Sequence, residues 1–129
     1  MENPELIKLQ SVLEQEPSLE LAVLVGSRAE NRAHENSDWD IAIQWKREIS
    51  PFDILADTET LRRKLAKSIS VDETKIDLIN IPSAKLAMRA VIAEEGVMLK
   101  GEDDLAWNHL LSRTWRELEM YEWEKQHKL

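Results

Sequence analysis

The chain has 129 residues, a formal net charge of −8, 43% apolar residues and no cysteine. This length suits one domain with a core, and the lack of cysteine excludes a disulfide framework and a thiolate zinc site. No run approaches about 18 apolar residues, and no apolar leader follows Met-Glu-Asn-Pro, so we expect a single cytoplasmic domain over residues 1–129 with no membrane segment.

The acidic excess lies in the first half of the chain. Residues 1–60 carry 13 acidic and 5 basic side chains, whereas residues 61–129 carry 12 of each. Such a charge distribution repels phosphate-rich polymers unless cations intervene. The sequence therefore predicts no direct nucleic-acid binding, although it is compatible with a magnesium site that recruits a nucleotide.

Hydrophobic periodicity predicts alternating helices and strands in the first half. A helix is expected over residues 5–16, ended by Pro17, and a buried strand over 19–25. Gly26 ends that strand, and Ser27 is a good N-cap for a short helix through about residue 33. An alternating strand follows over 39–45, and residues 46–53 form a connection.

The second half continues the alternation. A helix over residues 57–69 turns Leu61 and Leu65 inward and Arg62 outward, and a strand over 75–81 follows it. Pro82 and Ser83 start a helix through about residue 95, with Gly96 as its C′ residue, before a short strand over 97–100. The predicted fold is α/β (α+β): a small mixed sheet of about four strands flanked by helices.

A final helix is expected over residues 102–126. It carries an apolar stripe made of Trp107, Leu111, Trp115 and Leu118. The stripe is compatible with packing against the sheet. Since Tyr121 and Trp123 extend the aromatic character beyond what so short a chain easily buries, part of this helix is also a candidate partner interface.

Two carboxylates share one face of the predicted strand over residues 39–45. Side chains two residues apart in a strand lie about 6.5 Å apart on the same face, so Asp38 and Asp40 stand together. The opposite face is apolar: Trp39, Ile41, Ile43 and Trp45. Aspartate within a strand is disfavoured without a neutralising partner, and Asp77 raises the same question in the strand over 75–81. That partner is either an arginine or a pair of divalent ions of the kind used in phosphoryl transfer.

The turn at Gly26 and Ser27 is a candidate anion site. Glycine lets a ligand approach the backbone closely, and free N–H groups at a helix start bind phosphate. The alternative is that glycine simply ends a strand and serine caps a helix. The segment matches neither the dinucleotide fingerprint nor the P-loop.

Together these signals resemble a known family. The pattern is Gly26-Ser27, ten residues, Asp38-x-Asp40 and a third aspartate, Asp77, in a later strand, and it resembles the DNA polymerase beta-type nucleotidyltransferases. Over residues 5–100 the chain is similar to the minimal nucleotidyltransferase (MNT) antitoxins of HEPN–MNT toxin–antitoxin pairs.

The resemblance has one departure. Those antitoxins often carry Arg-Gly where this chain has Glu30 and Asn31. Asparagine tolerates the left-handed backbone that glycine would supply, so the turn is expected to survive. Arg32 either replaces the lost phosphate contact or is a solvated charge.

The resemblance implies a protein adenylyltransferase that moves AMP from ATP to a tyrosine hydroxyl of a HEPN ribonuclease toxin and so inactivates it. Its implied cofactors are two Mg²⁺ ions, with ATP as substrate, and the C-terminal helix over 102–126 serves the toxin interface. The implied catalytic and metal-binding residues are Asp38, Asp40 and Asp77, and the implied nucleotide-binding residues are Gly26, Ser27, Arg28 and Arg32.

Three alternatives stay open at this point. A non-catalytic antitoxin would mask the toxin by binding alone. A small-molecule nucleotidyltransferase of the aminoglycoside type would need no protein partner. In a purely structural reading, the carboxylates only pair with Arg28 or Arg32.

Overall fold

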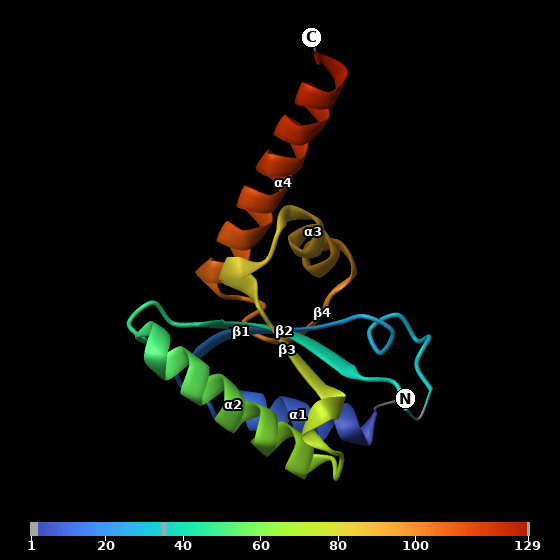
Figure 1. Ribbon diagram of the computed structural model, residues 1–129, viewed down its shortest axis with the longest axis vertical. Helices are drawn as coiled ribbons and strands as arrows, with labels where there is room; N and C mark the ends of the chain where they lie inside the picture. The colour runs from blue at the N-terminus through green and yellow to red at the C-terminus, as the bar shows by residue number, and fades with distance from the viewer. Residues whose placement is uncertain (1–2, 35, 129) are drawn as a thin grey trace.

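A mixed four-stranded sheet separates two layers of helices. The structure, a computed structural model, describes residues 3–34 and 36–128. Figure 1 shows helices α1 and α2 on one face of the sheet and α3 and α4 on the other. The helices are α1 (Pro4–Glu14), α2 (Pro51–Ser68), α3 (Leu86–Glu95) and α4 (Leu105–Gln126), and the strands are β1 (Leu19–Val25), β2 (Trp39–Trp45), β3 (Ile76–Asn80) and β4 (Val97–Lys100). Two short 3₁₀ turns, η1 (Glu73–Lys75) and η2 (Ile81–Ser83), flank β3.

The sheet order is β3-β2-β1-β4. Strand β1 pairs antiparallel with both β2 and β4, whereas β2 pairs parallel with β3. A parallel pair requires a crossover, and α2 provides it. The predicted mixed sheet flanked by helices is confirmed.

The alternation of β2 gives each face of the sheet its own core. Its apolar face packs under α1 and α2 with Leu9, Leu13, Leu61 and Leu65, and contains Trp39, Ile41, Ile43 and Trp45. Ala42, on the opposite face, joins a smaller core beneath α3 and α4. The carboxylates predicted to share that opposite face therefore point to the α3 and α4 side, away from the larger core.

Helix α2 begins six residues earlier than the prediction. The Ser50 hydroxyl accepts a hydrogen bond from the backbone N–H of Asp53 at 3.2 Å, and Pro51 occupies the first helical turn. Phe52 and Leu55 in the early turns are exposed, so these turns bury no apolar stripe that periodicity could detect. Capping chemistry, rather than burial, sets this boundary.

The predicted short helix after β1 is wrong. The backbone N–H of Ala29 donates to the Gly26 carbonyl at 3.0 Å, and the chain then continues as turns rather than a helix. Asn31 has a φ of 57°, which ends helical propagation. The expectation that asparagine would take the left-handed conformation is confirmed.

The region around α3 also differs from the prediction. Helix α3 starts at Leu86 rather than at Pro82, because Ala84 and Lys85 are extended. Gly96 has a φ of −69°, so it is not a left-handed C′ residue. It is needed for space instead, since a methyl group there would collide with Val23 Cγ1 and the Ile92 carbonyl oxygen.

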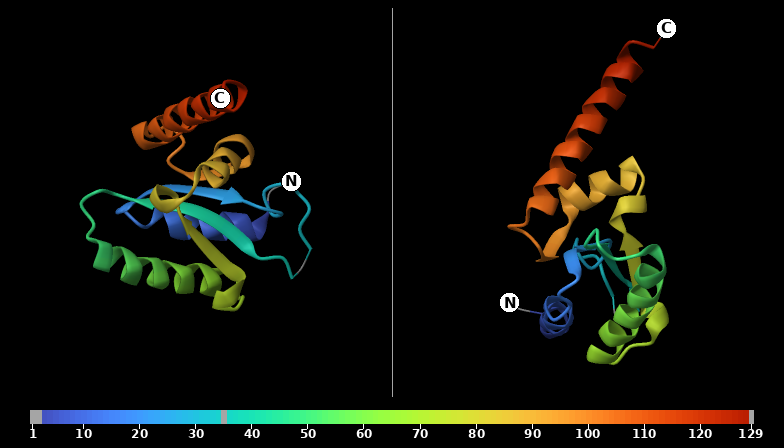
Figure 2. Two further views of the ribbon diagram at one scale, coloured as in Figure 1. Left: turned by 45° about the horizontal axis from the view of Figure 1, so that its top comes forward. Right: turned by 90° about the vertical axis from the view of Figure 1, so that its left-hand side faces the viewer.

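Only the first half of α4 packs on the body of the protein. Leu110 and Thr114 are buried, Trp107 packs against the smaller core, and Arg89 of α3, itself buried, pairs with Glu117. The second half projects away from the sheet, as Figures 1 and 2 show. Of the predicted stripe, Trp107, Leu111 and Leu118 are half-buried and Trp115 is exposed, while the fully buried positions of α4 are Leu110 and Thr114. None of the helices in the two described ranges is long and apolar enough to cross a membrane.

Candidate active site

The three predicted aspartates meet where β2 and β3 begin. The parallel register places Asp40 opposite Asp77, and neighbouring strands lie about 4.8 Å apart. Asp38 precedes β2 and shares the face of Asp40 by alternation. Asp38 and Asp77 are exposed and Asp40 is half-buried, so a solvent-borne ligand has access to all three.

Gly26 closes one side of this cluster. The β1–β2 register pairs Val25 with Asp40, so the next residue, Gly26, turns beside the carboxylate. Its φ is 76°, and a methyl group at this position would collide with Asp40 Oδ2. Glycine is therefore required both for the left-handed backbone and for the close approach. Ser27 follows in the same turn.

The charged form of Asp40 is disfavoured by its surroundings. Burial, followed by the charges of Asp77 and Asp38, raises the pKa of Asp40 above its ordinary value. A bound cation would offset this repulsion. Within residues 3–34 and 36–128, no three acidic or histidine side chains already form a metal cage. Magnesium commonly binds through one or two carboxylates together with substrate phosphates, and this donor set fits that mode.

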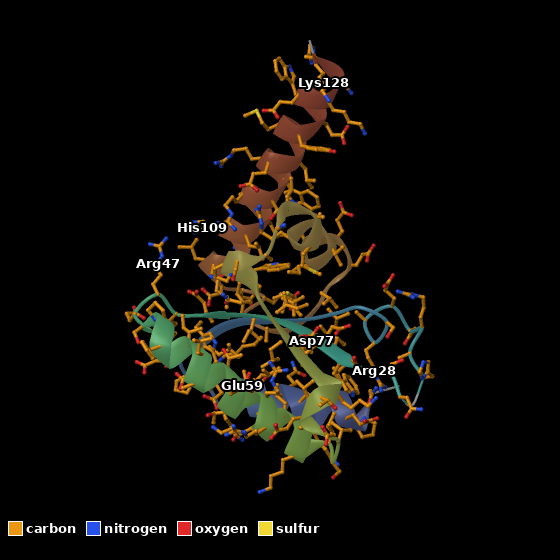
Figure 3. All side chains as sticks on the ribbon, viewed as in Figure 1. Arg28, Arg47, Glu59, Asp77, His109 and Lys128 are labelled. Carbon is orange, nitrogen blue, oxygen red and sulfur yellow. The ribbon has the colours of Figure 1, made fainter. Side chains whose placement is uncertain are left out.

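Arg28 contacts the apolar side of β2. Its guanidinium stacks over the Trp39 ring at 4.3 Å from the centroid and donates to the Ser37 carbonyl at 2.9 Å. Trp39 belongs to the face of the sheet opposite to Asp40. These two contacts of Arg28 therefore hold the turn between β1 and β2. Figure 3 labels both Arg28 and Asp77.

Arg32 is also engaged elsewhere. Its Nη2 lies 2.5 Å from Glu30 Oε2, and 64% of its side chain is exposed. The hydrogen bond and charge of Glu30 raise the pKa of Arg32. Glu30 stands where related antitoxins often carry an arginine. It thus pairs with Arg32, the residue that was a candidate to replace that arginine.

Two basic residues that the sequence analysis did not assign to the site adjoin it. Lys75 Nζ lies 3.9 Å from Asp38 Oδ1 and donates to the Asn36 carbonyl at 3.2 Å. Arg62, predicted to point outward, donates to the Ile76 carbonyl at 2.6 Å and so anchors the start of β3 next to Asp77. The sequence signal for Lys75 was weak, namely its position two residues before Asp77, because Lys75 lies in the turn η1 rather than in β3.

A cleft of about 240 Å³ lies next to the acids but does not contain them. It is lined by Glu5, Arg28, Asn36, Ser37, Trp39, Val71, Asp72 and Lys75. Lys75 is the residue that both borders this cleft and contacts Asp38. Asp38 and Asp77 are exposed and Asp40 is half-buried, which leaves room for a second macromolecule to approach.

Residues 7–105 match the family model described as polymerase beta, nucleotidyltransferase, and the chain belongs to this family. Among solved structures, it resembles a toxin–antitoxin with AMP-PNP, with 25% identity, a TM-score of 0.70, and 97% of this chain and 94% of the other covered. The predicted resemblance to MNT antitoxins and the predicted fold are confirmed.

Two further structures, below 25% identity, support the fold. One is a toxin–antitoxin, MntA–HepT, at 24% identity and a TM-score of 0.64, covering 95% of this chain and 92% of the other. The second is a tri-AMPylated Shewanella oneidensis HEPN toxin in complex with MNT antitoxin, at 22% identity and a TM-score of 0.64, covering 95% and 91%. Comparison with curated proteins gives no match.

Proposed function

We propose that this nucleotidyltransferase is an antitoxin that transfers AMP from ATP to a tyrosine hydroxyl of a HEPN ribonuclease toxin and thereby inactivates it. The observation that carries the proposal is the register of β2 and β3, which sets Asp40 beside Asp77 with Asp38 on the same face. Structures of relatives support it, since one includes AMP-PNP and another an AMPylated HEPN toxin. Both ATP and the RNA substrate of such a toxin belong to the cytoplasm, where we place the reaction.

Each acid has a distinct role in the proposed reaction. Asp38 and Asp40 would hold two Mg²⁺ ions, which neutralise the triphosphate and lower the pKa of the acceptor hydroxyl. Asp77 accepts the proton of that hydroxyl. The tyrosine oxygen bonds to the α-phosphorus while the bond from that phosphorus to the bridging oxygen breaks, and pyrophosphate leaves. The N–H of Gly26 and the hydroxyl of Ser27 orient the phosphates.

In this proposal a partner protein supplies the acceptor, which can approach the exposed Asp38 and Asp77. We assign the projecting half of α4 as the surface that binds the toxin. Tyr121 and Trp123 there are 54% and 59% exposed, and Trp115 is exposed as well. Exposed aromatic side chains of this kind are typical of protein interfaces.

The modification inactivates the toxin by charge and bulk. An AMP group adds an anion next to a site that must bind RNA phosphates, so substrate is repelled and obstructed.

The test is to incubate the purified protein with α-labelled ATP, Mg²⁺ and the toxin encoded beside it. Label is expected on a toxin tyrosine and absent with Asp38→Ala/Asp40→Ala. Unlabelled toxin, or undiminished label with the double variant, refutes the enzymatic function.

A second candidate is an antitoxin that neutralises by masking alone, favoured by the exposed aromatic residues of α4. In that case the Asp38→Ala/Asp40→Ala variant still protects cells from the toxin, whereas the proposed transfer requires that protection be lost. A small-molecule nucleotidyltransferase would instead label an aminoglycoside without any protein partner.

A further inference from the structure

The start of β2 and β3 presents a two-by-two array of charged side chains. The register pairs Trp39 with Ile76 and Asp40 with Asp77. Extended by one position, it sets Lys75 opposite Asp38, and the ion pair of 3.9 Å between Lys75 Nζ and Asp38 Oδ1 agrees. One pair in the array is therefore Asp38 and Lys75, an acid and a cation, and the other is Asp40 and Asp77, two acids.

The backbone of Lys75 belongs to the capped turn η1, whereas its side chain makes weak contacts. The Asp72 carboxylate caps η1 by accepting from the Thr74 N–H at 3.0 Å and from the Thr74 hydroxyl at 2.9 Å. The side chain of Lys75 is 41% exposed, and its ammonium has one hydrogen bond of 3.2 Å to the Asn36 carbonyl. An exposed ion pair at this separation is weak and is readily exchanged for a better one.

The arginines predicted to bind the phosphates have other partners in this structure. Arg28 stacks on Trp39 and donates to the Ser37 carbonyl, and Arg32 pairs with Glu30. Lys75, in contrast, already borders the carboxylates that would receive the metal-bound nucleotide. A lysine is a flexible point charge, and lysines commonly bind phosphate in nucleotide sites.

We propose that Lys75 is a triphosphate-binding residue, which pairs with Asp38 before nucleotide binds and moves to the β- or γ-phosphate afterwards. This inference rests on the proposed nucleotidyl transfer. Asp38 would hold a divalent cation, whose charge would weaken the pairing of Lys75 with that carboxylate and favour its pairing with the triphosphate. The same positive charge then stabilises pyrophosphate as it leaves.

The test is calorimetric titration of the full chain with AMP-PNP and, separately, with AMP, both with Mg²⁺. Lys75→Gln is expected to weaken AMP-PNP binding about tenfold or more, as for a lost hydrogen bond between charged groups. Binding of AMP, which lacks the outer phosphates, is expected to be unchanged. Lys75→Arg should largely restore AMP-PNP binding, because it keeps the charge. The matched control is Lys67→Gln, the same change on the exposed face of α2.

Three results overturn the inference. Equal AMP-PNP affinity for Lys75→Gln and Lys67→Gln refutes phosphate binding, as does an equal loss of AMP-PNP and AMP. Tighter binding of Mg²⁺ alone by Lys75→Gln, with AMP-PNP affinity unchanged, identifies Lys75 as a counter-ion of Asp38 only. If the unsubstituted chain binds no AMP-PNP, both the inference on Lys75 and the proposed function fail. If it binds AMP-PNP and only the Lys75 variants behave as above, the inference alone fails.

Discussion

Replacing Gly26 with alanine tests whether the turn and the acids form one site. The substitution forces a side chain into a backbone with a φ of 76° and drives its methyl group into Asp40 Oδ2. The left-handed conformation costs about 1–2 kcal/mol. The collision is relieved by rotating the end of a flexible carboxylate, so it adds little to that cost. For a chain of this size we expect the melting temperature to fall by about 4–10 °C and the fold to survive.

The effect on activity should be much larger than the effect on stability. Moving Asp40 by about 1 Å is enough to reduce the rate of transfer about a hundredfold. The assay measures label transferred from ATP to the toxin, per folded molecule, at a temperature below the midpoint of unfolding of the variant.

Gly101→Ala is the matched control for this experiment. Gly101 also has a left-handed backbone, with a φ of 91°, but its added methyl group would meet Glu20 and Leu21, away from the acids. It should lose stability and keep its rate per folded molecule. If Gly26→Ala loses activity only in proportion to its unfolded fraction, as the control does, the reasoning is refuted.

Further predictions concern the acids, α4 and Arg28. Asp40→Asn abolishes transfer while raising the free energy of unfolding at pH 7 by up to about 1 kcal/mol, measured in urea, because it removes a charge that burial and the neighbouring acids disfavour. Burial and neighbouring acids raise the pKa of Asp40. Its protonated form therefore stabilises the fold fully below the unfolded pKa of 3.8, and this stabilisation is lost as pH rises through the pKa of the folded state. Wild type should thus lose stability over that range relative to Asp40→Asn, and a flat difference contradicts this. Trp123→Ala leaves the melting temperature nearly unchanged but weakens toxin binding by about 2 kcal/mol in a titration, whereas unaltered affinity removes α4 from the interface. Arg28→Ala lowers the free energy of unfolding by about 1–2 kcal/mol through the lost contacts to Trp39 and Ser37. A loss of AMP-PNP affinity with unchanged stability would show instead that Arg28 serves the phosphates.

Side-chain alternation predicted the strands and the shared face of Asp38 and Asp40. Apolar residues on one side of β2 are buried under α1 and α2, as their period of two requires. Alternation also marked Asp77 as unfavourable within its strand, but only the family resemblance implied that it joins the other two acids. The structure pairs Asp40 with Asp77 across β2 and β3, a contact between distant parts of the chain that periodicity alone does not reveal.

The positions of the arginines could not be predicted in the same way. Arg28 follows the Gly-Ser turn directly, yet its guanidinium stacks on the ring of Trp39, which lies eleven positions later in the chain. Its direction depends on the path of the intervening turns, which periodicity does not describe. Lys75 was missed for a related reason, because its contact with Asp38 exists only through the pairing of β2 with β3.

The attachment of α4 to α3 has a consequence for the proposed choice of acceptor. Removing Glu117 would leave the buried Arg89 guanidinium without its countercharge, so this ion pair helps to fix the angle between the two helices. Under the proposed function, a toxin bound by the outer part of α4 would meet the acids at a set distance. Selection among its tyrosines would then depend on length and direction, with α4 acting as a measuring arm.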